Sequence, residues 1–187
     1  MSKIFVVSAP SGAGKTTVVR KVIEKFPEIV FSISATTRPK RDFEVDGVDY
    51  FFMNETEFKK KIESDQFVEW EYFYGYYYGT LKSFVNSETE KGNSVLLEVD
   101  VKGALKIKEV YPEAITLFIL PPSIEELKNR LIKRKTESSE DLAKRIERAE
   151  MEIDFKKHFQ YHIVNDNVDK AREKVFNILS NELTKEK

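Results

Sequence analysis

The sequence contains no cysteine and almost no net charge, and each absence argues against a class of function. Without cysteine the chain forms no disulfide and offers no thiolate ligand to a metal, which is consistent with a reducing compartment. The 31 Lys and Arg residues nearly balance the 32 Asp and Glu residues, which leaves a formal net charge of −1. Whole-chain charge therefore gives no reason to expect a nucleic-acid partner or an anionic membrane.

Long hydrophobic runs are also absent. The apolar run within MSKIFVVSAP, residues 1–10, is far too short to span a membrane and does not match the apolar region of a signal peptide. We therefore expect a cytoplasmic protein without a membrane partner.

Histidine is rare. The two histidines, His158 and His162, are four residues apart, a spacing that can place two metal ligands on one face of a helix. The sequence has no cysteine and no third clustered ligand beside them, and His162 falls in a predicted strand, where helical spacing does not apply. The pair is therefore not expected to hold a metal.

The residues that are present are typical of a globular protein. Hydrophobic residues make up 41% and charged residues 34% of the 187 residues, which suits one domain with small inserted parts. Short apolar segments alternate with segments of helical periodicity, and this alternation predicts a parallel α/β sheet flanked by helices. The expected strands are 4–8, 29–34, 94–100, 114–122 and 161–165, and the expected helices are 16–26, 54–64, 81–91, 101–111, 123–134, 142–155 and 168–183.

One stretch, residues 32–83, interrupts the alternation. It is rich in turn residues and aromatics, and it is predicted to form a lobe inserted into the α/β core. Its aromatic segment YFYGYYYG could stack on single-stranded nucleic acid, but core and pocket walls suit the charge balance better.

The segment FVVSAPSGAGKTT, residues 5–17, has the order strand, glycine-rich loop and helix that binds phosphate. Gly12 and Gly14 allow a tight loop whose amides point inward, Lys15 supplies a cation, and Thr16 or Thr17 supplies a hydroxyl for Mg²⁺. The pattern usually begins with glycine, where this chain has Ala9, and the added methyl group matters only if that position needs a positive φ. The alternative is an ordinary turn before a helix.

Other motifs are ambiguous by themselves. The segment TTRPKR is equally compatible with a solvated basic loop, and Glu69 within FVEWEYF lies either on a solvated strand face or in a ligand site. The sequence DVKG, residues 100–103, also fits the D-x-x-G of GTP-hydrolysing switches. That interpretation is disfavoured because the chain has no Asn-Lys dipeptide and so lacks the guanine-binding N-K-x-D motif.

Taken in order, these segments resemble the guanylate kinase family along nearly the whole chain. The similar segments are SAPSGAGKTT, FSISATTRPKR, GVDYFF, FVEWEYF, YYGT, VLLEVDVKG, FILPPS and YHIVND. The resemblance implies a P-loop parallel sheet flanked by helices, with an inserted mixed α+β lobe that binds the nucleoside monophosphate and a helical lid. The implied boundaries are 1–33, 84–125 and 157–187 for the core, 34–83 for the lobe and 126–156 for the lid.

The same resemblance implies Mg-ATP-dependent phosphorylation of GMP, and of dGMP, in purine nucleotide metabolism. Implied ATP contacts are Ala9, Pro10, Ser11, Gly12, Ala13, Gly14, Lys15, Thr16, Thr17 and Asn165, with the Thr16 hydroxyl on Mg²⁺. Implied GMP contacts are Ser34, Arg38, Arg41, Tyr50, Glu69, Tyr78, Thr80 and Asp100. The chemistry agrees, because Arg and Tyr suit a phosphate dianion and a carboxylate can accept both N1–H and N2–H₂ of guanine.

The lid region, LKNRLIKRKTESSEDLAKRIERAEMEI, can also be explained as two helices with solvated charges. The resemblance implies instead that Arg134 and Arg145 are catalytic with Lys15, while Arg130 and Arg148 are weaker candidates.

Three residues depart from the family pattern. Lys135 stands where the family usually has Gly, Glu98 where it commonly has Asp, and Lys102 where it commonly has Gln. Two alternatives stay open, a kinase of this fold with another acceptor and a non-catalytic binding module.

Overall fold

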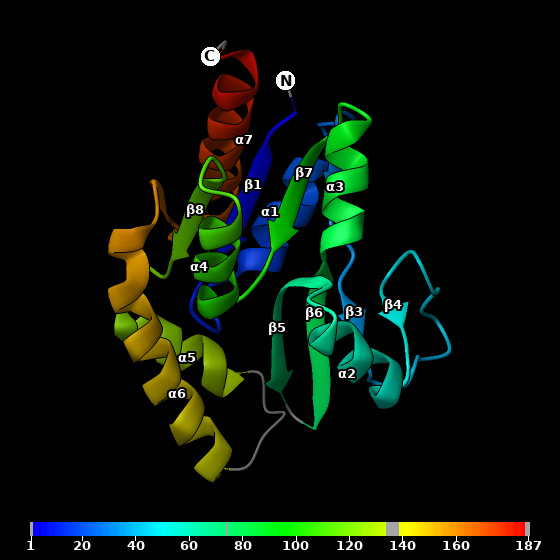
Figure 1. Ribbon diagram of the computed structural model, residues 1–187. Coiled ribbons are helices and arrows are strands. Elements are labelled where there is room, and N and C mark those ends of the chain that lie inside the picture. The colour runs from blue at the N-terminus through cyan, green and yellow to red at the C-terminus, as the bar shows by residue number, and fades with distance from the viewer. Residues whose placement is uncertain (1, 74, 134–138, 186–187) are drawn as a thin grey trace.

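The computed structural model describes all residues except 1, 74, 134–138 and 186–187. Its centre is a five-stranded parallel sheet in the order β2-β7-β1-β8-β9 (Figure 1). The strands are β1 (Ile4–Ser8), β2 (Ile29–Phe31), β7 (Ser94–Glu98), β8 (Ile115–Leu120) and β9 (Tyr161–Val164).

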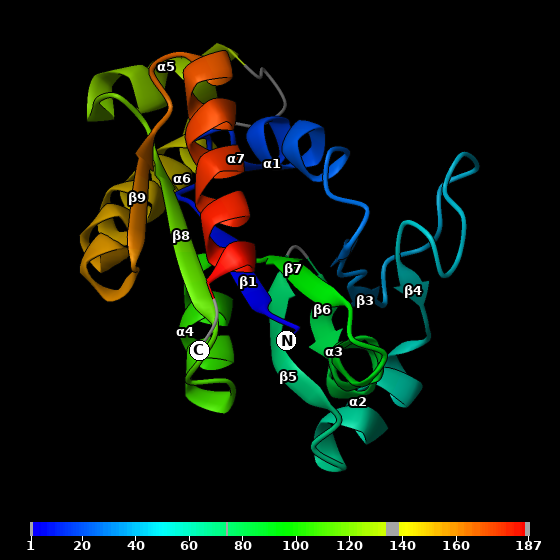
Figure 2. The same cartoon turned by 90° about the horizontal axis from the view of Figure 1, so that it is seen from above.

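Helices cover both faces of this sheet, as Figure 2 shows from above. Alternate residues of β1 point to opposite faces. Phe5 and Val7 pack with one cluster, which includes apolar residues of α1 (Lys15–Ile23) and α7 (Val168–Thr184). Ile4 and Val6 pack with another, formed with α3 (Lys82–Glu90) and α4 (Val101–Val110). Burial on both faces explains the continuous apolar runs in the sequence, and the predicted α/β class is confirmed.

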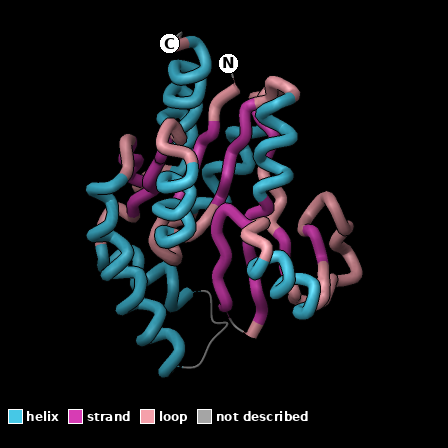
Figure 3. The backbone as a smooth tube through the Cα atoms, viewed as in Figure 1, coloured by secondary structure: helices cyan, strands magenta, loops and turns pink. Residues whose placement is uncertain are grey.

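The inserted stretch forms a second, four-stranded sheet in the order β4-β3-β6-β5, visible beside the main sheet in Figure 3. Its small core stacks Phe58 on Phe67, with ring centroids 4.3 Å apart. Asn54 caps the helix of this lobe, accepting a hydrogen bond of 2.8 Å from the Glu57 amide as predicted. The elements are β3 (Ala35–Thr36), β4 (Phe51–Phe52), α2 (Glu55–Glu63), β5 (Phe67–Phe73) and β6 (Tyr76–Leu81).

The strand predicted for 29–34 forms only over β2, Ile29–Phe31, and its extension to residue 34 is wrong. The Ser32 amide still bonds to Leu96 of the main sheet, whereas the Ser34 carbonyl accepts from Phe51 of the lobe. The chain therefore passes from one sheet to the other between these residues. An apolar run alone does not reveal such a change of partner.

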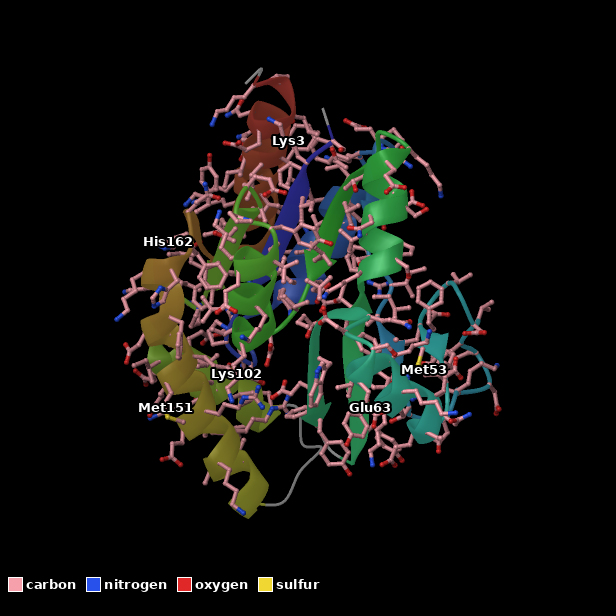
Figure 4. All side chains as sticks on the ribbon, in the orientation of Figure 1. Lys3, Met53, Glu63, Lys102, Met151 and His162 are labelled. Atoms are coloured by element: carbon pink, nitrogen blue, oxygen red, sulfur yellow. The ribbon has the colours of Figure 1, made fainter. Side chains whose placement is uncertain are left out.

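Two further helices, α5 (Ile124–Lys133) and α6 (Ser139–Ile153), pack on each other through Leu127, Leu131 and Ala149. A short 3₁₀ turn, Asp154–His158, follows α6, so the helix predicted to reach 155 ends two residues earlier. Figure 4 labels Met151 on α6, Lys102 at the start of α4 and Glu63 on α2. In the part of the chain that the structure describes, every helix is too short or too polar to cross a bilayer.

Candidate active site

The loop between β1 and α1 has the backbone that a phosphate loop needs. Gly12 and Gly14 have φ values of +90° and +91°, a region that favours glycine. A Cβ at Gly14 would lie 2.5 Å from Nδ2 of Asn165, which donates a 2.8 Å hydrogen bond to the Ala13 carbonyl. Asn165, expected to contact ATP, is thus placed against the loop backbone. Ala9 has no positive φ, because Asp65 is the one non-glycine residue with that conformation among those described.

Lys15 and Thr16, at the start of α1, reach the end of β7. The Lys15 ammonium donates to the Val99 carbonyl at 2.6 Å and lies 4.0 Å from Oε1 of Glu98. Burial lowers the pKa of Lys15, and the Glu98 and Asp100 carboxylates oppose that change. The Thr16 hydroxyl donates to Glu98. A cation and a hydroxyl therefore lie together at the helix N-terminus, where anions are favoured.

Glu69 of β5 and Thr80 of β6 are opposite each other in the lobe sheet, and the Thr80 hydroxyl donates to Oε1 of Glu69 at 2.6 Å. Burial raises the pKa of the Glu69 carboxyl to about 7, and the Thr80 hydrogen bond opposes the rise. This carboxylate is therefore not on a solvated strand face.

The start of α4 brings Asp100 to Glu69. Asp100 caps the helix by accepting a 2.7 Å hydrogen bond from the Gly103 amide. A Cβ at Gly103 would lie 3.1 Å from both the Asp100 and the Glu69 carboxylate. Gly103 is thus the close-approach position that lets a carboxylate of the lobe meet one of the core. Sequence analysis noted the D-x-x-G pattern but did not assign Gly103 this role.

Three of the residues expected at the acceptor phosphate also meet. The Arg38 guanidinium lies 5.3 Å from the ring centroid of Tyr50, whose ring is 6.4 Å from that of Tyr78. Arg38 is held by Glu44, with Nη2 to Oε1 at 2.6 Å and Nη1 to Oε2 at 3.1 Å. The Arg41 amide donates to the same carboxylate at 2.8 Å, while the Arg41 side chain is exposed.

Glu44 is a residue that sequence analysis missed. It is only 6% exposed, although Lys40, Arg41 and Asp42 nearby are exposed, and hydrogen bonding from Arg38 lowers its pKa. The sequence showed an acid close to two arginines, but the exposed Asp42 has the same neighbours. Ser34, expected at the base, lies between the two sheets, and for its hydroxyl the described residues provide no side-chain hydrogen bond.

The candidate arginines on α5 and α6 make different contacts. Nε of Arg145 donates to the Ser11 hydroxyl of the phosphate loop at 3.0 Å. Arg130, on α5, donates instead to the Glu126 carboxylate and to the Asn165 carbonyl. The third predicted catalytic residue, Arg134, and the neighbouring Lys135 lie outside the described residues.

A cavity of about 570 Å³ is lined by the phosphate loop, the tip of β5, Asp100 and α6, while Glu69, Thr80 and Arg38 lie outside its lining. Such a volume suits a small organic ligand.

Away from this cavity, the Nε2 atom of His162 is 2.7 Å from the Lys156 carbonyl. The described ranges contain no group of three or more His, Cys, Asp or Glu residues that could hold a metal ion.

Comparison with known proteins gives a consistent result. Residues 1–182 match the family model described as guanylate kinase. The chain is 52% identical over 172 residues to a guanylate kinase of Caldanaerobacter subterraneus, covering 92% of this chain and 84% of that one. It is 44% identical over 183 residues to a guanylate kinase of Thermotoga maritima, covering 98% and 88%.

A solved structure agrees with these sequence matches. The crystal structure of guanylate kinase from Anaplasma phagocytophilum superposes with a TM-score of 0.77 at 32% identity, covering 98% of this chain and 87% of that chain. The chain therefore belongs to the guanylate kinase family of nucleoside monophosphate kinases, whose known reaction is the ATP-dependent phosphorylation of GMP.

Proposed function

We propose that this chain phosphorylates GMP with ATP and that the core binds ATP while the lobe, with Asp100, binds GMP. The backbone N–H groups of residues 11–14, with Lys15, hold the phosphates of ATP. Glu69, Thr80 and Asp100 bind the guanine of GMP, and Arg38, Tyr50 and Tyr78 bind its phosphate. The exposed Arg41 side chain joins that phosphate site, and Ser34 adds a hydroxyl to the base site.

The single observation that carries this proposal is the pairing of Glu69 with Asp100 beside the phosphate loop. A Cβ at residue 103 would lie 3.1 Å from an oxygen of each carboxylate, a tight contact, so Gly103 leaves room for both groups on the same side of α4. Neighbouring like charges are unfavourable unless donors lie between or beside them. Guanine offers those donors at N1–H and N2–H₂, whereas adenine presents a bare N1 acceptor to the same site.

In the proposed reaction an oxygen of the GMP phosphate attacks the γ-phosphorus of ATP. A bond forms from that oxygen to phosphorus, and the bond from phosphorus to the bridging oxygen of ADP breaks. Lys15 and Arg145 stabilise the negative charge on the transferring group, and α6 excludes water. A general base is unnecessary because the attacking oxygen is already anionic. Arg134 stays a prediction of the resemblance.

The oxygen donors at the start of α1 fit Mg²⁺. The Thr16 hydroxyl and the Glu98 carboxylate lie in contact beside Lys15, and hydroxyl and carboxylate oxygens are the ligands that this ion prefers. When bound with ATP, Mg²⁺ neutralises charge on the β- and γ-phosphates. We propose Thr16 as its direct protein ligand and Glu98 as the residue that orients Thr16 or a bound water.

The experiment is ADP release from Mg-ATP with GMP, dGMP, IMP, AMP, UMP or dTMP as sole acceptor. GMP should exceed AMP in kcat/KM by at least roughly three decades. A good bidentate base contact discriminates by about 1–3 kcal/mol, and an unpaired buried carboxylate adds to that. IMP, which keeps N1–H but lacks the N2 amine, should fall between them.

Glu69→Gln is the variant that tests the base site, with Glu57→Gln on the exposed face of α2 as the matched control. Glu69→Gln should reduce turnover of GMP more than that of AMP, because the amide has one acceptor oxygen and an unwanted donor. An unchanged GMP-to-AMP ratio would remove Glu69 from the base site. Absence of ADP release with every acceptor would instead favour a non-catalytic binding module.

A further inference from the structure

Arg148 of α6 bridges three parts of the molecule at once. Its Nε donates to Oε1 of Glu152 at 2.8 Å, on the same helix. Its Nη2 donates to Oδ2 of Asp100 at 3.0 Å and to Oε1 of Glu71 at 3.3 Å. Its guanidinium carbon lies 5.1 Å from the ring centroid of Phe73. One side chain therefore links α6, the start of α4 and the tip of β5.

The contact with Asp100 places Arg148 next to the proposed base site. Oδ1 of Asp100 is used by the Gly103 amide as a helix cap, and Oδ2 is the oxygen that Arg148 contacts. The carboxylate is thus held at both oxygens, which fixes its orientation. Each carboxylate oxygen can accept more than one hydrogen bond, so these contacts leave Asp100 able to accept from a base.

Glu71 explains why an arginine is suited to this position. Burial and the neighbouring Asp100 carboxylate raise the pKa of Glu71 to about 7, and Arg148 opposes that rise. Two neighbouring carboxylates tend to share a proton, and a guanidinium beside them favours their ionised forms. Only a forked cation can donate to Glu152 with one nitrogen and to Asp100 and Glu71 with another.

Glu152 extends the connection to the donor side. Its other oxygen, Oε2, accepts a 3.2 Å hydrogen bond from the Ser11 amide of the phosphate loop. The path therefore runs from the phosphate loop through Glu152 and Arg148 to Asp100 and Glu71. Figure 1 shows α6, the start of α4 and β5 at the same end of the molecule.

We propose that Arg148 is a positioning residue for GMP recognition, orienting Asp100 and tying α6 to the acceptor lobe through Glu71. This proposal rests on the proposed function of the same site. Arg148 itself acts through Asp100 and need not touch the transferring phosphoryl group. Removing it should therefore weaken the use of GMP while leaving the chemical step and the use of ATP largely unaffected.

The size of the effect follows from exposure. The side chains of Arg148, Glu71 and Asp100 are 32%, 32% and 29% exposed, so water screens their pairing in part. Arg148→Ala should raise the KM for GMP by roughly tenfold, at the lower end of ordinary coupling between sites, with little change in kcat or in the KM for ATP.

The experiment measures kcat and both KM values for wild type, Arg148→Ala, Glu71→Ala and the double variant. If the two residues act through one contact, Glu71→Ala should have a smaller effect in the Arg148→Ala background than in wild type. Arg148→Lys should recover only part of the GMP affinity, because an ammonium lacks the fork. Lys128→Ala, which breaks a 2.8 Å ion pair with Glu150 between α5 and α6, is the matched control and should behave as wild type.

Each outcome decides for or against the proposal. A fall in kcat with an unchanged KM for GMP, additive effects of the two substitutions, or the same shift in Lys128→Ala would overturn it. If Arg148→Ala fails to fold by thermal unfolding, Arg148→Lys and Glu71→Gln give the same comparison with side-chain volume retained. Wild-type turnover of GMP tests the proposed function separately, so failure of one does not conceal failure of the other.

Discussion

The donor-phosphate loop and the proposed acceptor-phosphate site are built differently. The donor loop uses backbone amides at the start of α1, with two glycines at positive φ and a single cation, Lys15. The proposed acceptor site uses side chains, in which Arg38 is clamped by Glu44 beside the ring of Tyr50. Backbone amides bind any phosphate, whereas side chains on separate strands can also be arranged to read a base. We therefore expect the selectivity of this enzyme to lie on the acceptor side.

Substitution of Lys15 is expected to have the largest effect, because it should remove activity without removing GMP binding. Lys15→Ala should abolish measurable turnover, because the donor phosphates lose their cation, but should leave GMP binding nearly intact. Calorimetric titration of the variant with GMP measures this, with ADP release as the activity readout. Simultaneous loss of GMP binding and activity, in a protein that still unfolds cooperatively, would mean that the division between donor and acceptor sites is wrong.

The next largest effect is expected on kcat when Arg145, which hydrogen-bonds to the donor loop from α6, is replaced. Arg145→Ala should lower kcat by on the order of 10³-fold with little rise in the KM for GMP, as arginines that stabilise a transferring phosphoryl group do elsewhere. Steady-state kinetics at saturating ATP measures it, with Arg148→Ala as the matched loss of an arginine from the same helix. A larger fall in kcat for Arg148→Ala than for Arg145→Ala would show that the two roles are exchanged.

A smaller effect is expected on the pH dependence of stability, through Glu69 on the acceptor side. Because burial raises the pKa of Glu69 to about 7, the folded protein binds a proton more tightly than the unfolded chain, whose glutamate titrates near 4.5. The contribution of this group to stability is full below about pH 4.5 and is lost as the pH rises through about 7. Glu69→Gln removes that loss and keeps an acceptor for the Thr80 hydroxyl.

Urea unfolding from pH 5 to pH 8 measures this prediction. The free energy of unfolding of wild type should fall across that window more steeply than that of Glu69→Gln, and the variant should be the more stable protein at pH 8. Parallel pH profiles of the two proteins would show that Glu69 is solvated. The donor loop has no comparable buried acid, so Thr17→Ala, on the exposed start of α1, should follow wild type.

The smallest effect tests the departure in the donor loop. Ala9→Gly should change ATP affinity by less than about tenfold, or roughly 1.4 kcal/mol, because position 9 does not have a positive φ and gains nothing from glycine. Equilibrium binding of ATP to both proteins measures it. A hundredfold gain in affinity would indicate that the Ala9 methyl group disturbs the loop.

Most of the core followed from the sequence, because its signals are local. The strand before Ala9, the loop glycines and the helix after Lys15 are contiguous, and each follows from rules that need no distant partner. The exchange of sheets between Ser32 and Ser34 did not follow, because residues 29–34 read as one strand although β2 ends at Phe31. The role of Glu44 was missed although it is local, since a charged loop residue gives no sign of burial.

The amino-acid sequence was sufficient to predict the α/β core, the phosphate loop and, through the ordered motifs, the family. The contacts of Glu69 and Asp100 near Gly103, and of Arg148 with Glu71, 77 positions away, became evident only in the folded structure. These groups come from the lobe, the core and α6, and their distances depend on how these three parts of the fold pack against one another. Sequence periodicity and spacing report only on residues that are close in the chain. The raised pKa of Glu69 results from burial in the packed site, so the sequence could not reveal it.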